Sequence, residues 1–246
     1  MPLLSEPWRL FFLLAGPFVG TLAATWAVAW PRLPRPLAGA SVCARCGAVI
    51  PPARQIPIVS WVLSRGGRLC CDGRIPHAYP LGETAGLAVG LACALFTATP
   101  AEAALKLLLG AALIYAALVD LRRFVIPAQA IALVAALGLA EHLRRVDLPA
   151  LMDGVIGAVG VAAVFETLRR VSALGGGKPR MGAGDGLLAA ALALWIGWQG
   201  VPLLVAAAAL GALLVLAFRR RRGVVSFGLW LSAAGGAAVV GVLPGG

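Results

Sequence analysis

Charged residues are scarce in this chain. They make up 13% of its 246 residues, whereas hydrophobic residues make up 61%. An ordinary soluble domain carries about 25% charged residues. The composition therefore excludes a typical soluble globular protein and indicates a chain that crosses a membrane several times.

Apolar segments long enough to cross a bilayer recur along the sequence. A hydrocarbon core of about 30 Å requires roughly 20 apolar residues in a helix. We therefore predict an all-α polytopic membrane protein with about eight transmembrane helices. The expected spans are 10–29, 82–99, 103–119, 125–140, 149–167, 185–199, 201–217 and 224–243. We expect the first span to be retained, because Glu6 precedes it and its apolar run is long for a signal peptide.

Acidic residues are also few, with 10 Asp and Glu against 21 Lys and Arg. The positions of the basic residues are more informative than the net charge, because 17 of the 21 fall on one side of the membrane if the first span starts outside. The positive-inside rule makes that side cytoplasmic and places both termini outside. We expect contacts with membrane lipids, including anionic lipids at the Arg219 to Arg222 run, and no nucleic-acid partner. The 17 residues are Arg32, Arg35, Arg45, Arg54, Arg65, Arg68, Arg74, Arg122, Arg123, Arg169, Arg170, Lys178, Arg180 and Arg219 to Arg222.

The segment 31–80 is rich in proline, glycine and arginine and contains Cys43, Cys46, Cys70 and Cys71. Disulfides are disfavoured in the cytoplasm, so paired cysteines there are more often metal ligands. The alternative is a reduced thiol loop without metal. We expect three regions: a first transmembrane segment over 1–30, a cytoplasmic cysteine module over 31–80, and a transmembrane bundle over 81–246 that carries any catalytic site.

Two aspartates lie at the cytoplasmic ends of predicted spans. Asp120 ends a helix that runs inward and Asp185 begins one that runs outward, so both carboxylates can lie at the same depth and meet. Membrane carboxylates are costly and usually functional. A pair that shares one water also shares a proton, and one member acts as base while the other acts as acid.

Gly182 and Gly184 lie just before the second aspartate and would let a bound peptide approach the backbone. A simple helix cap is the alternative for Asp185 taken alone. Of the other acids, Glu83 is expected to extend towards the headgroups in preference to contacting the cysteine module.

Taken together, these motifs resemble the type IV prepilin peptidase family, the GxGD-type aspartic peptidases of the bacterial inner membrane. The residues "GAGD" at 182–185 match one motif, with Leu187 where a Lys is usual, and Asp120 followed by Ile126 and Pro127 matches the other. The resemblance implies an endopeptidase that removes the leader of type IV prepilins or pseudopilins at the cytoplasmic face. Asp120 and Asp185 would be catalytic, and Gly182 and Gly184 would contact substrate.

The same resemblance implies a structural zinc bound by two Cys-x-x-Cys pairs. Cys43 and Cys46 form one pair, but Arg68 replaces the partner of Cys71, so that Cys70 or His77 would supply the fourth ligand. Many members also carry an Asn and an Arg linked to N-methylation of the new pilin N-terminus. Ala24 and Ala29 occupy those places here. Proteolysis would need no cofactor, and S-adenosylmethionine would be needed only if methyl transfer is retained.

Two other classes of function stay open on the residues alone. A proton- or ion-coupled transporter also uses membrane carboxylates, although its site usually lies at the bilayer midplane and not at one face. A non-catalytic pilus or secretion assembly protein is the other alternative.

Overall fold

The structure, a computed structural model, describes residues 6–32, 42–43, 46–67, 70–71, 73–174, 182–219 and 226–239. Within these ranges the chain forms helices and two isolated β-bridges but no sheet. The predicted all-α class is confirmed. Arg35, Arg45, Arg68, Lys178, Arg180 and Arg220 to Arg222, which entered the charge argument, lie outside the described residues.

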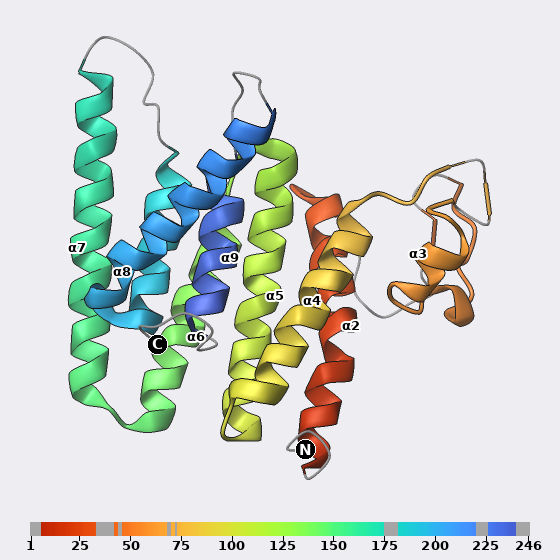
Figure 1. Cartoon of the computed structure of the whole chain (residues 1–246), viewed down its shortest axis with the longest axis horizontal. Coiled ribbons are helices and arrows are strands. Elements are labelled where there is room, and N and C mark those ends of the chain that lie inside the picture. The colour runs from red at the N-terminus through yellow and green to blue at the C-terminus, as the bar shows by residue number, and fades with distance from the viewer. Residues whose placement is uncertain are drawn as a thin grey trace.

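Long helices account for most of the described chain (Figure 1). They are α2 (Pro7–Ala29), α4 (Ala78–Phe96), α5 (Pro100–Arg123), α6 (Ala128–Arg145), α7 (Leu148–Ala173), α8 (Ala183–Arg219) and α9 (Phe227–Val239). The short η1 (Pro52–Arg54) and α3 (Val59–Leu63) lie between α2 and α4, in the region of the cysteines. Five helices, α2, α4, α5, α7 and α8, are long and apolar enough to cross a membrane. The protein is therefore a multi-pass membrane protein.

Helix α8 corresponds to two of the predicted spans. It contains 37 residues and is interrupted at Gly197, whose φ of 67° and ψ of 172° are not helical. The positive φ suits glycine, because other residues avoid this backbone region. The ribbon of α8 turns back on itself (Figure 1). When its two halves are counted separately, a helix of the described chain coincides with each of the eight predicted segments.

The contact between α2 and α4 depends on glycines. A Cβ added to Gly20 would lie 2.0 Å from the Gly82 carbonyl oxygen, and one added to Gly86 would lie 2.2 Å from the Gly16 carbonyl oxygen. Helices in a membrane pack through such small residues because lipid tails supply no hydrophobic drive for association. This close contact fixes α4, and with it the attachment point of the cysteine module, against α2.

Helix α5 lies at the centre of the bundle and contacts α2, α4, α6 and α9. Its buried residues run from Ala103 to Asp120. Much of the core is built from its side chains, among them Leu109, Leu113 and Val119. The acid near its C-terminal end is therefore placed inside the bundle and not on its lipid-facing surface.

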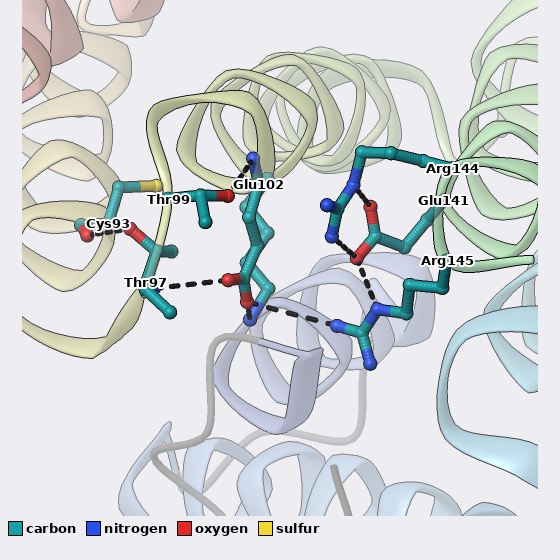
Figure 2. Close-up of polar contacts among 9 residues, drawn as sticks. Cys93, Thr97, Thr99, Glu102, Glu141, Arg144 and Arg145 are labelled. Carbon is teal, nitrogen blue, oxygen red and sulfur yellow. Dashed lines mark hydrogen bonds and ion pairs between the residues drawn. The ribbon is translucent and has the colours of Figure 1, made fainter.

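The N-terminal end of α5 carries a network of charges that Figure 2 shows. Glu102 pairs with Lys106 at 2.8 Å and reaches Arg145 at the end of α6 at 3.9 Å, while Glu141 binds Arg144 and Arg145 at 2.8 and 2.7 Å. Glu102 and Asp120 are 18 residues apart on one helix, about 27 Å along its axis. The network thus lies at the opposite end of the bundle from Asp120.

Candidate active site and metal centre

Asp120 lies in the last turn of α5 and is 5% exposed. The helix ends at Arg123, and Phe124, in the left-handed region, donates its backbone N–H to the Asp120 carbonyl oxygen at 2.8 Å. The side-chain oxygen Oδ2 accepts two hydrogen bonds from the start of α9. The donors are the Ser226 hydroxyl at 2.5 Å and the Leu229 backbone N–H at 3.1 Å.

Asp185 lies in the first turn of α8 and is partly buried. The helix begins at Ala183, so Asp185 is its third residue and not the cap. Its carboxylate turns back to the backbone N–H of Gly182, as an acid in a capping box does. The simple capping interpretation is therefore only part of its role, because the side chain also lies beside another acid.

Ile126, in the connection between α5 and α6, lies between the two aspartates. A Cβ added to Gly184, the neighbour of Asp185, would lie 3.1 Å from the Ile126 Cβ. A Cβ added to Gly228 would lie 2.7 Å from Ile126 Cδ1 and 2.9 Å from Asp120 Oδ2. The surroundings of both carboxylates therefore meet at one side chain, that of Ile126. The structure thus brings the predicted pair together, although 65 positions separate them in sequence.

The two predicted glycines differ in their surroundings. Gly182 is exposed, and a Cβ there would lie 3.1 Å from Asp185 Oδ2. Gly184 is partly buried against Ile126. A side chain at either position would crowd the acid or its neighbour, so both glycines keep space open beside Asp185.

Ser226 and Gly228 are the residues of this site that the sequence analysis missed. Serine before an apolar run is a typical helix cap, and that signal marks the start of α9. It does not reveal that the hydroxyl turns to an aspartate 106 positions away.

The first pair of cysteines lies on a tight loop. The Cys43 backbone N–H donates to the Ala48 carbonyl oxygen at 2.8 Å, and the Gly47 N–H donates to the Cys43 carbonyl oxygen at 2.9 Å. Gly47 has a φ of +72°, which glycine adopts without strain. The loop turns the thiols of Cys43 and Cys46 towards the second pair.

The second pair lies on a loop closed by a bridge between Gly67 and Arg74. The Gly73 N–H donates to the Cys71 carbonyl oxygen at 2.7 Å. The two loops face each other, so that Cys43 Sγ lies 4.0 Å from Cys71 Sγ and Cys46 Sγ lies 3.6 Å from Cys70 Sγ.

The donor set fits a zinc ion. All four sulfur atoms lie within 4.8 Å of one another, and four sulfurs at about 2.3 Å from a tetrahedral zinc lie about 3.8 Å apart. Hydrogen bonds with the thiols of Cys43 and Cys46 raise the pKa of the Cys70 thiol to about 12, because they favour its protonated form when no cation lies between the sulfurs. Among the described residues, the cluster contains the four cysteines and not His77, which precedes α4.

Glu83 connects this module to the bundle. Its side chain is 7% exposed and accepts from the Ile58 backbone N–H at 2.7 Å and from the Thr21 hydroxyl at 3.1 Å. The expectation of a headgroup-facing glutamate was wrong, because both carboxylate oxygens bind donors of α2 and of the module. Glu83 thereby joins the cysteine module to α2 and α4.

The fold and site define a class: a multi-pass helical membrane protein with two neighbouring aspartates at one end of its bundle, the arrangement of a membrane aspartic peptidase. Residues 107–217 match the type IV leader peptidase family, and residues 14–97 match the bacterial peptidase A24 N-terminal domain. The chain belongs to the type IV leader peptidase family.

Curated relatives extend over most of the chain. A prepilin leader peptidase/N-methyltransferase of Aeromonas salmonicida is 34% identical over 209 residues, which cover 81% of this chain and 70% of the relative. Proteins of the same name from Pectobacterium carotovorum subsp. carotovorum and Dickeya chrysanthemi are each 31% identical, covering 79% and 90% of this chain and 72% and 77% of the relatives. No solved structure matches the chain significantly. These relatives favour prepilin processing by a peptidase over a transporter or a non-catalytic protein.

Proposed function

We propose that this protein is an aspartic endopeptidase of the bacterial inner membrane that removes the short basic leader of type IV prepilins or pseudopilins. The observation that carries the proposal is the proximity of Asp120 and Asp185 at one end of the bundle, in a chain of this family. The substrate is a membrane-anchored helix whose leader lies in the cytoplasm. The membrane lipids around the bundle are its other partners.

In the proposed reaction the two acids act on one water and one peptide carbonyl. The ionised carboxylate removes a proton from the water, whose oxygen then attacks the carbonyl carbon. The protonated carboxyl polarises the carbonyl oxygen. Gly182 and Gly184 add no side-chain bulk beside Asp185, so that the substrate backbone can approach it. Proteolysis by this route uses no cofactor.

The charge distribution supports a cytoplasmic position for the acid pair. Arg122 and Arg123 end the same helix as Asp120, and Arg54, Arg65 and Arg74 lie in the cysteine module. Basic residues of short loops face the cytoplasm. In this orientation both termini are periplasmic.

The methyltransferase activity named for the relatives is a separate question for this chain. Ala24 is fully buried, and its Cβ lies 3.1 Å from where a Cβ of Gly82 would stand. A methyl group in that place provides no polar group for a cofactor or an amine. S-adenosylmethionine is a cofactor of this protein only if it methylates its product.

Co-expression with candidate prepilins, followed by mass measurement of the pilin N-terminus, tests the proposal. We expect a mass loss equal to the leader, and an added methyl group would show that methyl transfer is retained. A pilin that keeps its leader beside a correctly inserted protein, with every candidate tried, would contradict the proposed function.

We also propose that Cys43, Cys46, Cys70 and Cys71 hold one structural zinc ion, which would fix the two loops against each other. We expect about one zinc per purified chain, since a tetrahedral thiolate site is filled by one ion. The Cys43→Ser variant should lose the metal, and Cys93→Ser should keep it, because Cys93 is buried inside α4. Elemental analysis checks this. Metal-free wild-type protein with four titratable module thiols would refute it.

A further inference from the structure

The N-terminal end of α9 surrounds one oxygen of Asp120. Ser226 is 6% exposed, and its hydroxyl and the Leu229 N–H both donate to Oδ2. Gly228 lies between these donors, and its missing side chain lets the backbone approach the carboxylate, because a Cβ would lie 2.9 Å from Oδ2. Three residues at the start of α9, namely Ser226, Gly228 and Leu229, therefore pack against this oxygen.

Each of these features favours the ionised carboxylate. A backbone N–H can only donate, and a carboxylate oxygen with two donors accepts most strongly when it is charged. The start of a helix also carries a partial positive charge, and α9 is 13 residues long. A proton on Asp120 would lie on Oδ1, or on Oδ2 with the Ser226 hydroxyl reversed to accept it, and in both cases the Leu229 N–H would meet a neutral and weaker acceptor.

The two arginines that follow Asp120 on α5 contact other groups. Arg122 donates to the Ala27 carbonyl oxygen at 3.1 Å, and Arg123 lies over the Trp30 ring. Over their described side chains, α9 carries no titratable group, α8 carries only Asp185, α6 carries none before Glu141, and the one charge of α2 is Arg9 near its start. The one charge of α4 is Glu83, which binds Ile58 and Thr21. The α9 start is thus the polar partner of Asp120, and Asp185 is its charged neighbour.

The surroundings of Asp185 stabilise a negative charge less than those of Asp120 do. Its carboxylate meets the backbone N–H of the exposed Gly182, whereas Asp120 Oδ2 accepts from both Ser226 and Leu229. When two neighbouring carboxyls share a proton, the proton resides on the member whose ionised form has fewer donors.

We propose that Ser226 and the start of α9 hold Asp120 ionised, so that Asp120 is the general base and Asp185 the general acid. This assignment rests on the proposed peptidase function. Asp120 takes a proton from water as the water oxygen bonds to the carbonyl carbon, and Asp185 gives its proton to the carbonyl oxygen. When the C–N bond breaks, Asp120 returns its proton to the leaving amine and Asp185 recovers its own from the hydroxyl. Ser226 is a positioning residue in this scheme.

The test is the pH dependence of kcat/KM for a prepilin peptide in Ser226→Ala. Its acidic limb reports ionisation of the base in the free enzyme. Loss of a donor to the charged form should move that limb to higher pH by about one unit. Ser226→Thr keeps a hydroxyl and should restore the wild-type profile. Ser226→Cys, a weaker donor of similar size, should give a smaller shift.

The matched control is Ser232→Ala, because Ser232 is buried in the same helix and its hydroxyl has no hydrogen-bond partner among the described residues. Its profile should stay unshifted. A uniform loss of activity in Ser226→Ala and Ser226→Cys, with the acidic limb in place, would show a merely structural role and overturn the inference. If wild type and Ser232→Ala do not cleave at any pH, the proposed function itself fails.

Discussion

Asp120→Asn and Asp185→Asn are each expected to abolish leader removal while leaving membrane insertion unchanged. An amide can neither take a proton from water nor give one to a carbonyl oxygen at neutral pH. General acid–base catalysis by one positioned group contributes roughly 10²–10⁴-fold. Because the general base and the general acid are the two members of this pair, we expect each variant to lose at least about a thousandfold in kcat/KM. Quantitative cleavage of a purified prepilin measures the loss.

These substitutions keep the shape of the side chain, so a folding defect is not the expected cause. In Asp120→Asn the amide oxygen can still accept from Ser226 and Leu229. Asp153→Asn is the matched control, because Asp153 lies beside Gly197 at the interruption of α8, away from the acid pair. It should cleave as wild type does. Retained cleavage in either Asp120→Asn or Asp185→Asn would remove that residue from the mechanism.

Gly228→Ala is expected to reduce kcat/KM by about a hundredfold. The added methyl group would lie 2.9 Å from Asp120 Oδ2 and 2.7 Å from Ile126 Cδ1, closer than carbon contacts allow. Either the start of α9 or the carboxylate must move. Misplacement of a reacting group by about 1 Å can cost on the order of 10²-fold in rate. Steady-state cleavage of the prepilin peptide measures the effect.

Gly236→Ala controls for the substitution itself. Gly236 lies on the same helix, but a Cβ there would lie an ordinary 3.7 Å from Leu113 Cδ1. Alanine also favours a helix more than glycine does, by about 1 kcal/mol. Gly236→Ala should therefore retain both activity and insertion. Equal activities of Gly228→Ala and Gly236→Ala would show that the space beside Asp120 is not needed.

The helices of this protein were predictable because the bilayer allows few alternatives. A segment that crosses lipid must satisfy its own backbone hydrogen bonds, so a long apolar run is a helix. The adjacent predicted spans 185–199 and 201–217 also have helical counterparts, which meet at Gly197. The positions of Asp120 and Asp185 followed from the directions of their helices, since both ends then lie at one face.

The contacts that shape the site could not be predicted in this way. The glutamate at 83 binds Ile58 and Thr21, and Ser226 binds Asp120, so each interaction joins segments whose relative placement depends on how the helices pack. Sequence patterns report the environment of a residue along its own helix. They do not report which distant donor will face it.

The metal centre shows an intermediate case. Cys43, Cys46 and Cys71 were predictable from the cysteine motif, but the spacing of the second pair left Cys70 and His77 open as the fourth ligand. Adjacent cysteines can present both thiols to one point only if the loop turns between them. The bridge between Gly67 and Arg74 and the turn at Gly73 provide that geometry.

The most direct test of the central claim, that the two aspartates meet, is chemical cross-linking in native membranes. Asp120→Cys and Asp185→Cys would be combined in a Cys93→Ser background, with a protease cleavage sequence placed in the segment 175–181 between α7 and α8. After treatment with a short reagent that carries two thiol-reactive maleimide groups, and then with the protease, we expect the two fragments to stay joined in the double variant and to separate in each single variant. Separated fragments in the double variant, although both new thiols react with a monofunctional reagent, would contradict the account.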